Sequence, residues 1–194
     1  MRLQEARIRA ETGRALLEGP HLLSEAVAAG LRVERVFALP ADGSSAETAR
    51  RGGAELILVD ERGLRRLATT DHPQSPVAVI AIPPAMVPTG VHLLVAWGVG
   101  DPGNVGTLIR CAAAFGFAFA AGPGTADPWA PKVLRAAAGG HFRAGAVRVG
   151  SLDDLRVGGR RVVATVARHG LPPTALPAGL LAVLVGDEAH GLPS

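Results

Sequence analysis

The sequence has 194 residues, 48% of them hydrophobic, and a formal net charge of +3. This length fits one large domain or two small ones, and the apolar fraction is sufficient for a packed core. No apolar run approaches the roughly 18 residues needed to cross a bilayer. Met1–Glu5 lack the apolar stretch of a signal peptide, and the single Cys111 excludes an intrachain disulfide. We therefore expect a cytoplasmic protein.

A proline-rich segment divides the chain, because residues 82–90 contain three prolines, which cannot continue a helix or a central strand. We predict an α/β domain over residues 1–82, a linker over 83–90 and a second domain over 91–194. In the first domain, apolar patterns and capping signals predict a helix at 20–29 and another around Leu64 and Leu67. A third, short helix is predicted to begin at Ser44, which has capping-box spacing to Glu47. Strands are expected at 33–39, 56–59 and 77–82, and the run at 56–59 is typical of a buried strand.

The second domain alternates between apolar strand-like runs and helical patterns. Strands are predicted at 91–96, 117–121, 146–149, 162–166 and 180–185, and helices at 104–115, 131–138 and 151–156. Apolar strands with helices between them indicate a mostly parallel sheet. Since such sheets bind ligands beyond the carboxyl ends of their strands, the loops to consider are 97–104, 122–128, 167–173 and 186–192.

Gly98–Gly103 matches the G-x-G-x-x-G pattern of dinucleotide-binding turns, directly after a predicted strand. Pro102 removes an N–H group from the segment that should bind pyrophosphate. Asn104 is a favoured N-cap residue, and it places the expected helix start just beyond the pattern. A nicotinamide-dependent oxidoreductase therefore stays a remote alternative.

Three segments of the second domain form an ordered set of motifs. They are Asp101–Gly116, with its Asn-x-Gly-x-x-x-Arg core and Phe-Gly exit; Lys132–Phe142; and Leu184–Leu192, which contains Gly-x-Glu-x-x-Gly-Leu. In their order and spacing these segments resemble the motifs of SpoU-family (TrmH-family) RNA methyltransferases. Leu16–Pro20 and the helix after it resemble the substrate-binding domain that precedes the catalytic domain in many members. One departure is Ala137, where the family usually has Ser.

The resemblance implies a substrate-binding α/β domain followed by a parallel-sheet catalytic domain of the SPOUT type, with an α/β trefoil knot, one of the rare true knots. It implies S-adenosylmethionine-dependent 2′-O-methylation of a ribose in RNA, in a homodimer formed through the catalytic domain. Ribosomal RNA is the expected substrate and transfer RNA the closest rival. The family's third motif, Ile-Pro-Met followed by Ser-Leu-Asn-Val-Ser, is expected after Leu192, and the sequence stops at Ser194. The catalytic domain and its cofactor pocket are therefore expected to be incomplete at the C-terminal end, and a catalytically inactive RNA-binding protein is an alternative.

The resemblance assigns catalysis to Asn104, Arg110 and Glu188. An arginine stays protonated at ordinary pH and has no lone pair with which to accept a proton. We therefore expect Arg110 to grip an adjacent phosphate and to stabilise alkoxide charge, rather than to act as a base. Asn104 is expected to cap its helix, and Glu188 to fix Arg110 or Asn104 or the loop backbone.

The remaining expected site residues fall into two groups. Cofactor binding is assigned to Ala164, Thr165, Gly186 and Leu192, where Gly186 allows close backbone approach. Three basic side chains are candidates for contacts with RNA phosphates: Lys132, Arg135 and Arg143. The six histidines show no ligand spacing with Cys111 or with paired acids, so we predict no metal site.

Overall fold

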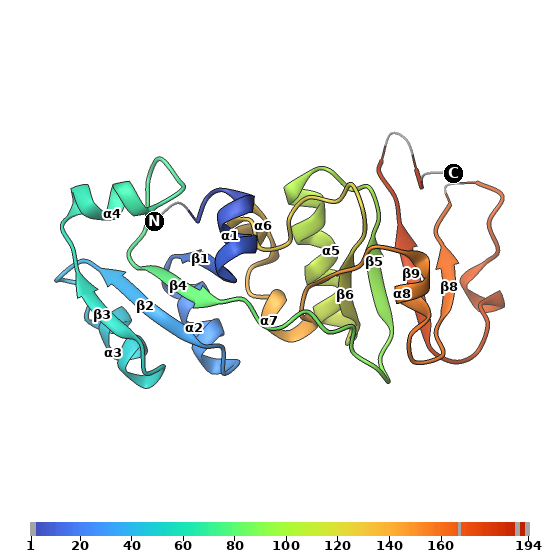
Figure 1. Cartoon of the computed structure of the whole chain (residues 1–194), viewed down its shortest axis with the longest axis horizontal. Coiled ribbons are helices and arrows are strands. Elements are labelled where there is room, and N and C mark those ends of the chain that lie inside the picture. The colour runs from blue at the N-terminus through green and yellow to red at the C-terminus, as the bar shows by residue number, and fades with distance from the viewer. Residues whose placement is uncertain (1–2, 167, 189–190, 193–194) are drawn as a thin grey trace.

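The computed structural model describes residues 3–166, 168–188 and 191–192. Two α/β parts lie end to end along the long axis of the molecule (Figure 1). The N-terminal part contains a four-stranded sheet and the C-terminal part a five-stranded sheet. Residues 82–92, which form neither helix nor strand, connect the two parts.

The N-terminal sheet is mixed, with the strand order β1-β4-β2-β3. Strand β4 pairs antiparallel with β1 and β2, whereas β2 and β3 are parallel. The strands are β1 (Arg14–Glu18), β2 (Val33–Ala38), β3 (Glu55–Leu58) and β4 (Val77–Ala81), and the helices are α1 (Ala6–Thr12), α2 (Pro20–Ala28), α3 (Gly43–Arg51) and α4 (Glu61–Leu67). The strands and helices predicted here are confirmed to within a few residues, whereas α1 and β1 have no counterpart among the predicted elements.

Two details of the N-terminal part differ from the sequence prediction. Helix α3 is capped by Asp42, whose carboxylate accepts a hydrogen bond from the Ser45 N–H over 3.1 Å, so the predicted capping box from Ser44 is wrong. The carboxylate precedes Ser44 in the chain and already occupies the capping position. The predicted burial of strand 56–59 is also wrong, because β3 pairs only with β2 at the sheet edge and leaves Leu58 59% exposed.

The C-terminal sheet is entirely parallel, in the order β7-β6-β5-β9-β8, which confirms the predicted parallel sheet. Its strands are β5 (Leu93–Ala96), β6 (Ala118–Ala121), β7 (Val147–Arg148), β8 (Arg161–Ala164) and β9 (Leu181–Val185). The intervening helices are α5 (Pro102–Phe115), α6 (Pro131–Ala137), α7 (His141–Ala144) and α8 (Leu152–Arg156), with a 3-10 turn at Pro173–Ala175.

Helices cover both faces of this sheet. Leu93 and Val95 of β5 belong to a buried cluster with Leu155 of α8, whereas Ala96 belongs to a second cluster with Ile109 of α5. Successive residues of a strand point to opposite faces, so the central strands β5 and β6 contribute to both clusters, whereas β9 contributes Ala182 and Leu184 to the cluster on the α8 face. Because both faces are covered, the loops at the strand ends are the places where this part can receive a ligand.

The two parts of the molecule share a hydrophobic core and an ion pair. Trp129 and Leu134 from the C-terminal part lie in the cluster that fills the N-terminal part. The buried Arg9 guanidinium of α1 binds the Asp127 carboxylate with its Nε at 2.8 Å and an Nη at 2.5 Å. This continuous packing fixes how the N-terminal part is oriented toward the five-stranded sheet.

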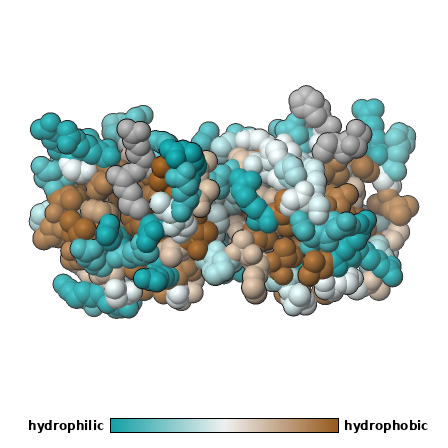
Figure 2. Space-filling view, in the orientation of Figure 1, coloured by the Kyte–Doolittle hydropathy of each residue, from teal (hydrophilic) through white to brown (hydrophobic). Residues whose placement is uncertain are grey.

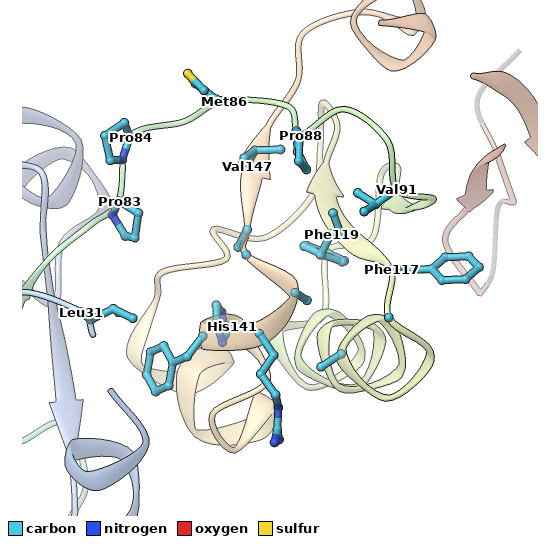
Figure 3. Close-up of a pocket in the computed structure, with 18 of the residues that line it drawn as sticks. Leu31, Pro83, Pro84, Met86, Pro88, Val91, Phe117, Phe119, His141 and Val147 are labelled. Carbon is cyan, nitrogen blue, oxygen red and sulfur yellow. The ribbon is translucent and has the colours of Figure 1, made fainter. Parts of the chain in front are cut away.

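The connecting segment is held against the C-terminal part. The buried Arg160 guanidinium donates to the carbonyl oxygens of Val91, Val157 and Pro88. Beneath the prolines of this segment lies a hollow of about 430 Å³, lined from the sheet by residues such as Phe119 and from α7 by His141 (Figure 3).

Candidate active site

The carboxyl ends of β8, β9 and β5 are tied together across the sheet. The Thr165 amide and hydroxyl both donate to the Leu184 carbonyl oxygen, each over 2.9 Å. On the other side of β9, the Trp97 N–H donates to the Val185 carbonyl oxygen over 2.9 Å. The structure therefore brings Ala164 and Thr165 next to Gly186, at the edge where ligands of parallel sheets bind.

Gly186 begins a tight turn. Asp187 and Gly191 exchange two backbone hydrogen bonds of 3.1 and 2.9 Å, and a Cβ on Gly186 would lie 2.4 Å from the Gly191 carbonyl carbon. The absence of a side chain at Gly186 therefore lets the backbone of Gly191 and Leu192 approach closely, a contact within the chain that the sequence interpretation did not include. The turn directs Leu192 back onto the cluster on the α8 face of the sheet.

Glu188 lies within this turn with an exposed side chain. Among the residues that the structure describes, no hydrogen bond or ion pair joins the Glu188 carboxylate to Arg110 or Asn104. The expected contact by which Glu188 would hold Arg110 or Asn104 in place is therefore not seen in the described part of the chain. Ala189 and His190, the next residues of the motif, lie outside it.

Helix α5 begins earlier than predicted, and Asn104 is not its N-cap. Asp101 takes that position, since its carboxylate accepts the Asn104 N–H over 2.9 Å, and Pro102 occupies the first helical turn. An aspartate followed by proline is a strong helix start, because the carboxylate satisfies a free N–H and proline needs none. The Asn104 side chain is consequently released from capping and half-buried near the carboxyl end of β5.

Gly106 in the Asn-x-Gly-x-x-x-Arg pattern has a packing role. A Cβ at Gly106 would lie 2.4 Å from the Ala136 Cβ, so its absence lets α5 and α6 cross closely. Gly140 acts similarly at the next turn, since a Cβ there would lie 3.3 Å from the Arg110 Cα. The glycines of the first and middle motifs therefore set the position of the helix that contains Arg110.

Arg110 is exposed on α5, six residues after Asn104, which corresponds to about 9 Å along the helix axis. Within the part of the chain that the structure describes, its guanidinium makes no hydrogen bond and no ion pair. A guanidinium without an internal partner is available to an anionic ligand such as phosphate.

The three candidate RNA contacts do not form one cluster. Lys132 is exposed in the first turn of α6, near the carboxyl end of β6. Arg135 is directed toward the N-terminal part, where its guanidinium lies 2.5 Å from the Thr69 hydroxyl and 3.7 Å from the Glu18 carboxylate. Arg143 lies on α7 beside the hollow under the connecting segment, toward the amino ends of the strands. Hydrophilic side chains are likewise spread over both parts of the molecule (Figure 2).

Trp97 is a residue at this edge that the sequence reasoning missed. It directly follows β5, is half-buried, and its ring covers Gly122, where a Cβ would lie 2.4 Å from the ring. The only signal in the sequence was an aromatic residue at the end of a predicted strand. Thr125 supports the same region, because its hydroxyl donates to the Ala96 carbonyl oxygen over 2.9 Å and accepts the Gly98 N–H over 3.1 Å.

Comparisons with known proteins agree with this geometry. Residues 92–194 match the family model of the SpoU rRNA Methylase family, and residues 1–78 match the MRM3-like substrate binding domain. The chain belongs to the SpoU rRNA methylase family. The first match covers the parallel sheet and the edge just described, and the second covers the mixed sheet as far as the start of β4.

Relatives of this SpoU methylase include ribosomal RNA methyltransferases. It is 32% identical to the 23S rRNA (guanosine(2553)-2'-O)-methyltransferase RlmP of Bacillus subtilis, over 98% of this chain and 78% of that protein. It is 33% identical to the mitochondrial rRNA methyltransferase 3 of Homo sapiens, over 70% of this chain but only 35% of that protein. An rRNA methyltransferase from Sinorhizobium meliloti, solved with AdoMet bound, superposes with a TM-score of 0.82 at 26% identity, covering 98% of this chain and 77% of that one.

Family membership confirms the predicted class of enzyme, an RNA methyltransferase that uses S-adenosylmethionine. The residues at the sheet edge fit an adenosine group, because a hollow of about 490 Å³ opens beside Ala164 and Thr165 with mostly apolar walls. Val166 and Leu171 line it and are 60% and 78% exposed. The Thr165 hydroxyl donates to Leu184 and keeps lone pairs that can accept from a ligand.

Two further observations concern only the described residues. No group of three or more His, Cys, Asp or Glu side chains lies where it could hold a metal ion. No helix is both long and apolar enough to cross a membrane.

Proposed function

We propose that this SpoU methylase methylates the 2′-hydroxyl of a ribose in ribosomal RNA at the carboxyl ends of β5, β9 and β8. The observation that supports the proposal most strongly is the pair of hydrogen-bonded contacts that Thr165 and Trp97 make to consecutive carbonyl groups of β9. These contacts support the proposal because they join the end of β8, the end of β9 and the start of the loop that leads into α5. Ribosomal RNA is favoured over transfer RNA because the relatives with assigned substrates are named for ribosomal RNA.

In this proposal the cofactor lies against Ala164, Thr165, the Gly186 turn and Leu192. When bound, it supplies a methyl group activated by a sulfonium. The protein must then hold the ribose hydroxyl in line with that methyl group and assist the loss of the hydroxyl proton. With the cofactor bound, the apolar side chains of Val166 and Leu171 would cover one side of the donor and keep water from it.

Arg110 is proposed as the catalytic residue that contacts the RNA. Its guanidinium has no internal partner among the described residues, and it cannot act as a base because it has no free lone pair. It is therefore suited to hold a phosphate next to the target ribose and to stabilise negative charge on the attacking oxygen. Asn104, released from capping by Asp101, is proposed to orient the ribose, and Glu188 to act from the turn after β9.

Three finer features also belong to the proposal. The exposed Phe115, 79% exposed at the end of α5, supports assembly of two copies near the helix that contains Arg110. A trefoil knot is proposed from the family and from the strand order of the parallel sheet. A cytoplasmic location is proposed because a methylase of this kind must reach ribosomal RNA.

The direct test is methyl transfer from radiolabelled S-adenosylmethionine to separate transcripts of 23S, 16S and transfer RNA, followed by mapping of 2′-O-methylated nucleotides. We expect one modified ribose in ribosomal RNA. Modification confined to transfer RNA would support the rival substrate. Tight RNA binding without any methyl transfer would instead support an inactive RNA-binding protein.

A further inference from the structure

A second hollow lies at the junction of the two parts, between α1 and the carboxyl ends of β6 and β7. Its volume is about 530 Å³, within the range of roughly 300–1,000 Å³ typical of ligand pockets. Its walls are mostly apolar, with Arg side chains at the margin; they include Ala6, Arg7, Ala10, Ile82, Trp129 and Arg148. Helix α1 stands at this junction, where its Arg9 meets Asp127 of the loop after β6 (Figure 1).

Two arginines, Arg9 and Arg148, share the Asp127 carboxylate at this junction cleft. The Asp127 carboxylate is neutralised from inside by Arg9, whose remaining N–H groups donate to the Leu3 and Gln4 carbonyl oxygens over 2.9 and 2.8 Å. Arg148 is only 3.8 Å from the same carboxylate, and its side chain is 55% exposed. The single Asp127 carboxylate therefore faces two guanidinium groups and can balance the charge of only one of them, so the junction keeps a net positive charge where the exposed Arg148 lines the cleft.

The cleft and the proposed methyl-transfer site lie on the same edge of the parallel sheet. Arg148 ends β7, and Asp127 lies in the loop after β6. In the strand order, β7 stands three strands from β9, a separation of about 14 Å at the usual strand spacing. A single RNA strand that lies along this edge can reach both places.

We infer that the junction cleft receives an unpaired nucleotide of the substrate RNA, with its base against the apolar wall and its phosphate at Arg148. Proteins that recognise single-stranded RNA combine apolar or aromatic surfaces for splayed bases with arginines for the backbone. A paired base cannot enter such a cleft, so the site selects a loop or bulge near the target ribose. The inference rests on the proposed function, since it assumes that RNA is the substrate.

Two variants of the whole chain test the inference by different routes. Arg148→Ala removes the phosphate contact, and Ala10→Trp fills the cleft from an exposed position on α1. The matched controls are Arg161→Ala, an exposed arginine at the amino end of β8, and Ala28→Trp, an exposed position at the end of α2. Affinity is measured by fluorescence anisotropy with a labelled single-stranded RNA of mixed sequence, with its duplex form, and with a 23S ribosomal RNA transcript.

We expect each cleft variant to weaken binding of single-stranded RNA about tenfold, while the controls stay within about twofold. Arg148→Ala should also lower the slope of log K against log salt concentration by about one, whereas Ala10→Trp should leave the slope unchanged. Affinity for S-adenosylhomocysteine should not change. Unaltered RNA affinity in both cleft variants, or a wild-type protein that binds no RNA, overturns the inference. A wild-type protein that binds RNA but transfers no methyl group contradicts the proposed function, and the affinities still decide the question of the cleft.

Discussion

Thr165 and Leu184 join the two segments proposed to hold the cofactor, because the amide and hydroxyl of Thr165 both donate to the Leu184 carbonyl oxygen over 2.9 Å. Leu184 stands two residues before Gly186, so this contact sets the distance between the end of β8 and the turn after β9. The Thr165 hydroxyl is the side-chain part of this contact, and it adds to the backbone pairing of β8 with β9.

Replacing Thr165 with Val should raise the KM for S-adenosylmethionine several-fold with a smaller change in kcat. The hydroxyl contact to Leu184 is lost, and with it about 1 kcal/mol of folding free energy. Thr48→Val is the control, because the Thr48 hydroxyl also donates to a backbone oxygen over 2.9 Å but lies on α3 in the N-terminal part. Equal effects of both variants on this KM would show that Thr165 has no special place at the site.

Gly106→Ala should destabilise the protein by about 1–3 kcal/mol, because the added Cβ would lie 2.4 Å from the Ala136 Cβ and force α5 and α6 apart. Helix propensity alone predicts the opposite sign, since Ala favours a helix over Gly by about 1 kcal/mol. Urea unfolding measures the difference, and adding Ala136→Gly should recover part of the loss. The control is Gly43→Ala, where a Cβ meets no atom within 4 Å. A stabilised Gly106→Ala protein would contradict the close helix crossing.

The stability of the protein should fall in mildly acidic solution because of His141. This side chain is buried, its Nε2 lies 2.7 Å from the Pro128 carbonyl oxygen, and burial lowers its pKa to about 4. Above its unfolded pKa of about 6.5 the histidine is neutral in both states, and the stability is fully present. As the pH falls from there toward 4, only the unfolded state takes up a proton, and the stability decreases by up to about 1.4 kcal/mol per pH unit.

Urea unfolding at several pH values checks this dependence. His141→Gln should be less stable at neutral pH, but it should show a shallower decline between pH 6.5 and 4. His72→Gln is the control, because the His72 side chain is exposed and makes no hydrogen bond within the described part of the chain. An identical pH dependence in wild type and His141→Gln would exclude this histidine as the cause.

The sequence was sufficient for the strands of the parallel sheet, because β5, β6 and β9 are apolar runs whose residues are mostly buried. It was insufficient where two local signals competed. Asn104 is a good N-cap residue in isolation, yet Asp101 followed by Pro102 begins the helix earlier. The run at 56–59 has the composition of a buried strand, but its edge position is decided by the neighbours it pairs with.

The candidate site shows the same limit. The glycines of the motifs stand out in the sequence, but their partners do not: Gly106 meets Ala136, Gly186 meets Gly191 and Gly122 meets Trp97. The contacts of Gly106 and Gly122 depend on tertiary packing between separate elements, which no spacing along the chain encodes. Arg135 is likewise a basic residue of the kind that contacts RNA, but in the structure its guanidinium lies 3.7 Å from the Glu18 carboxylate of the N-terminal part.

Arg110 gives the most direct test of the account, since its proposed role is to grip a phosphate and stabilise the attacking oxygen. Single-turnover methylation of the ribosomal RNA transcript should be slowed about 10²–10³-fold in Arg110→Ala, as for loss of a transition-state hydrogen-bond donor. Arg110→Lys should recover little, because a point charge cannot replace the planar fork. Affinity for S-adenosylhomocysteine should stay near that of the wild type in both variants. A near-wild-type rate of methyl transfer by Arg110→Ala would contradict the catalytic assignment at this edge of the sheet.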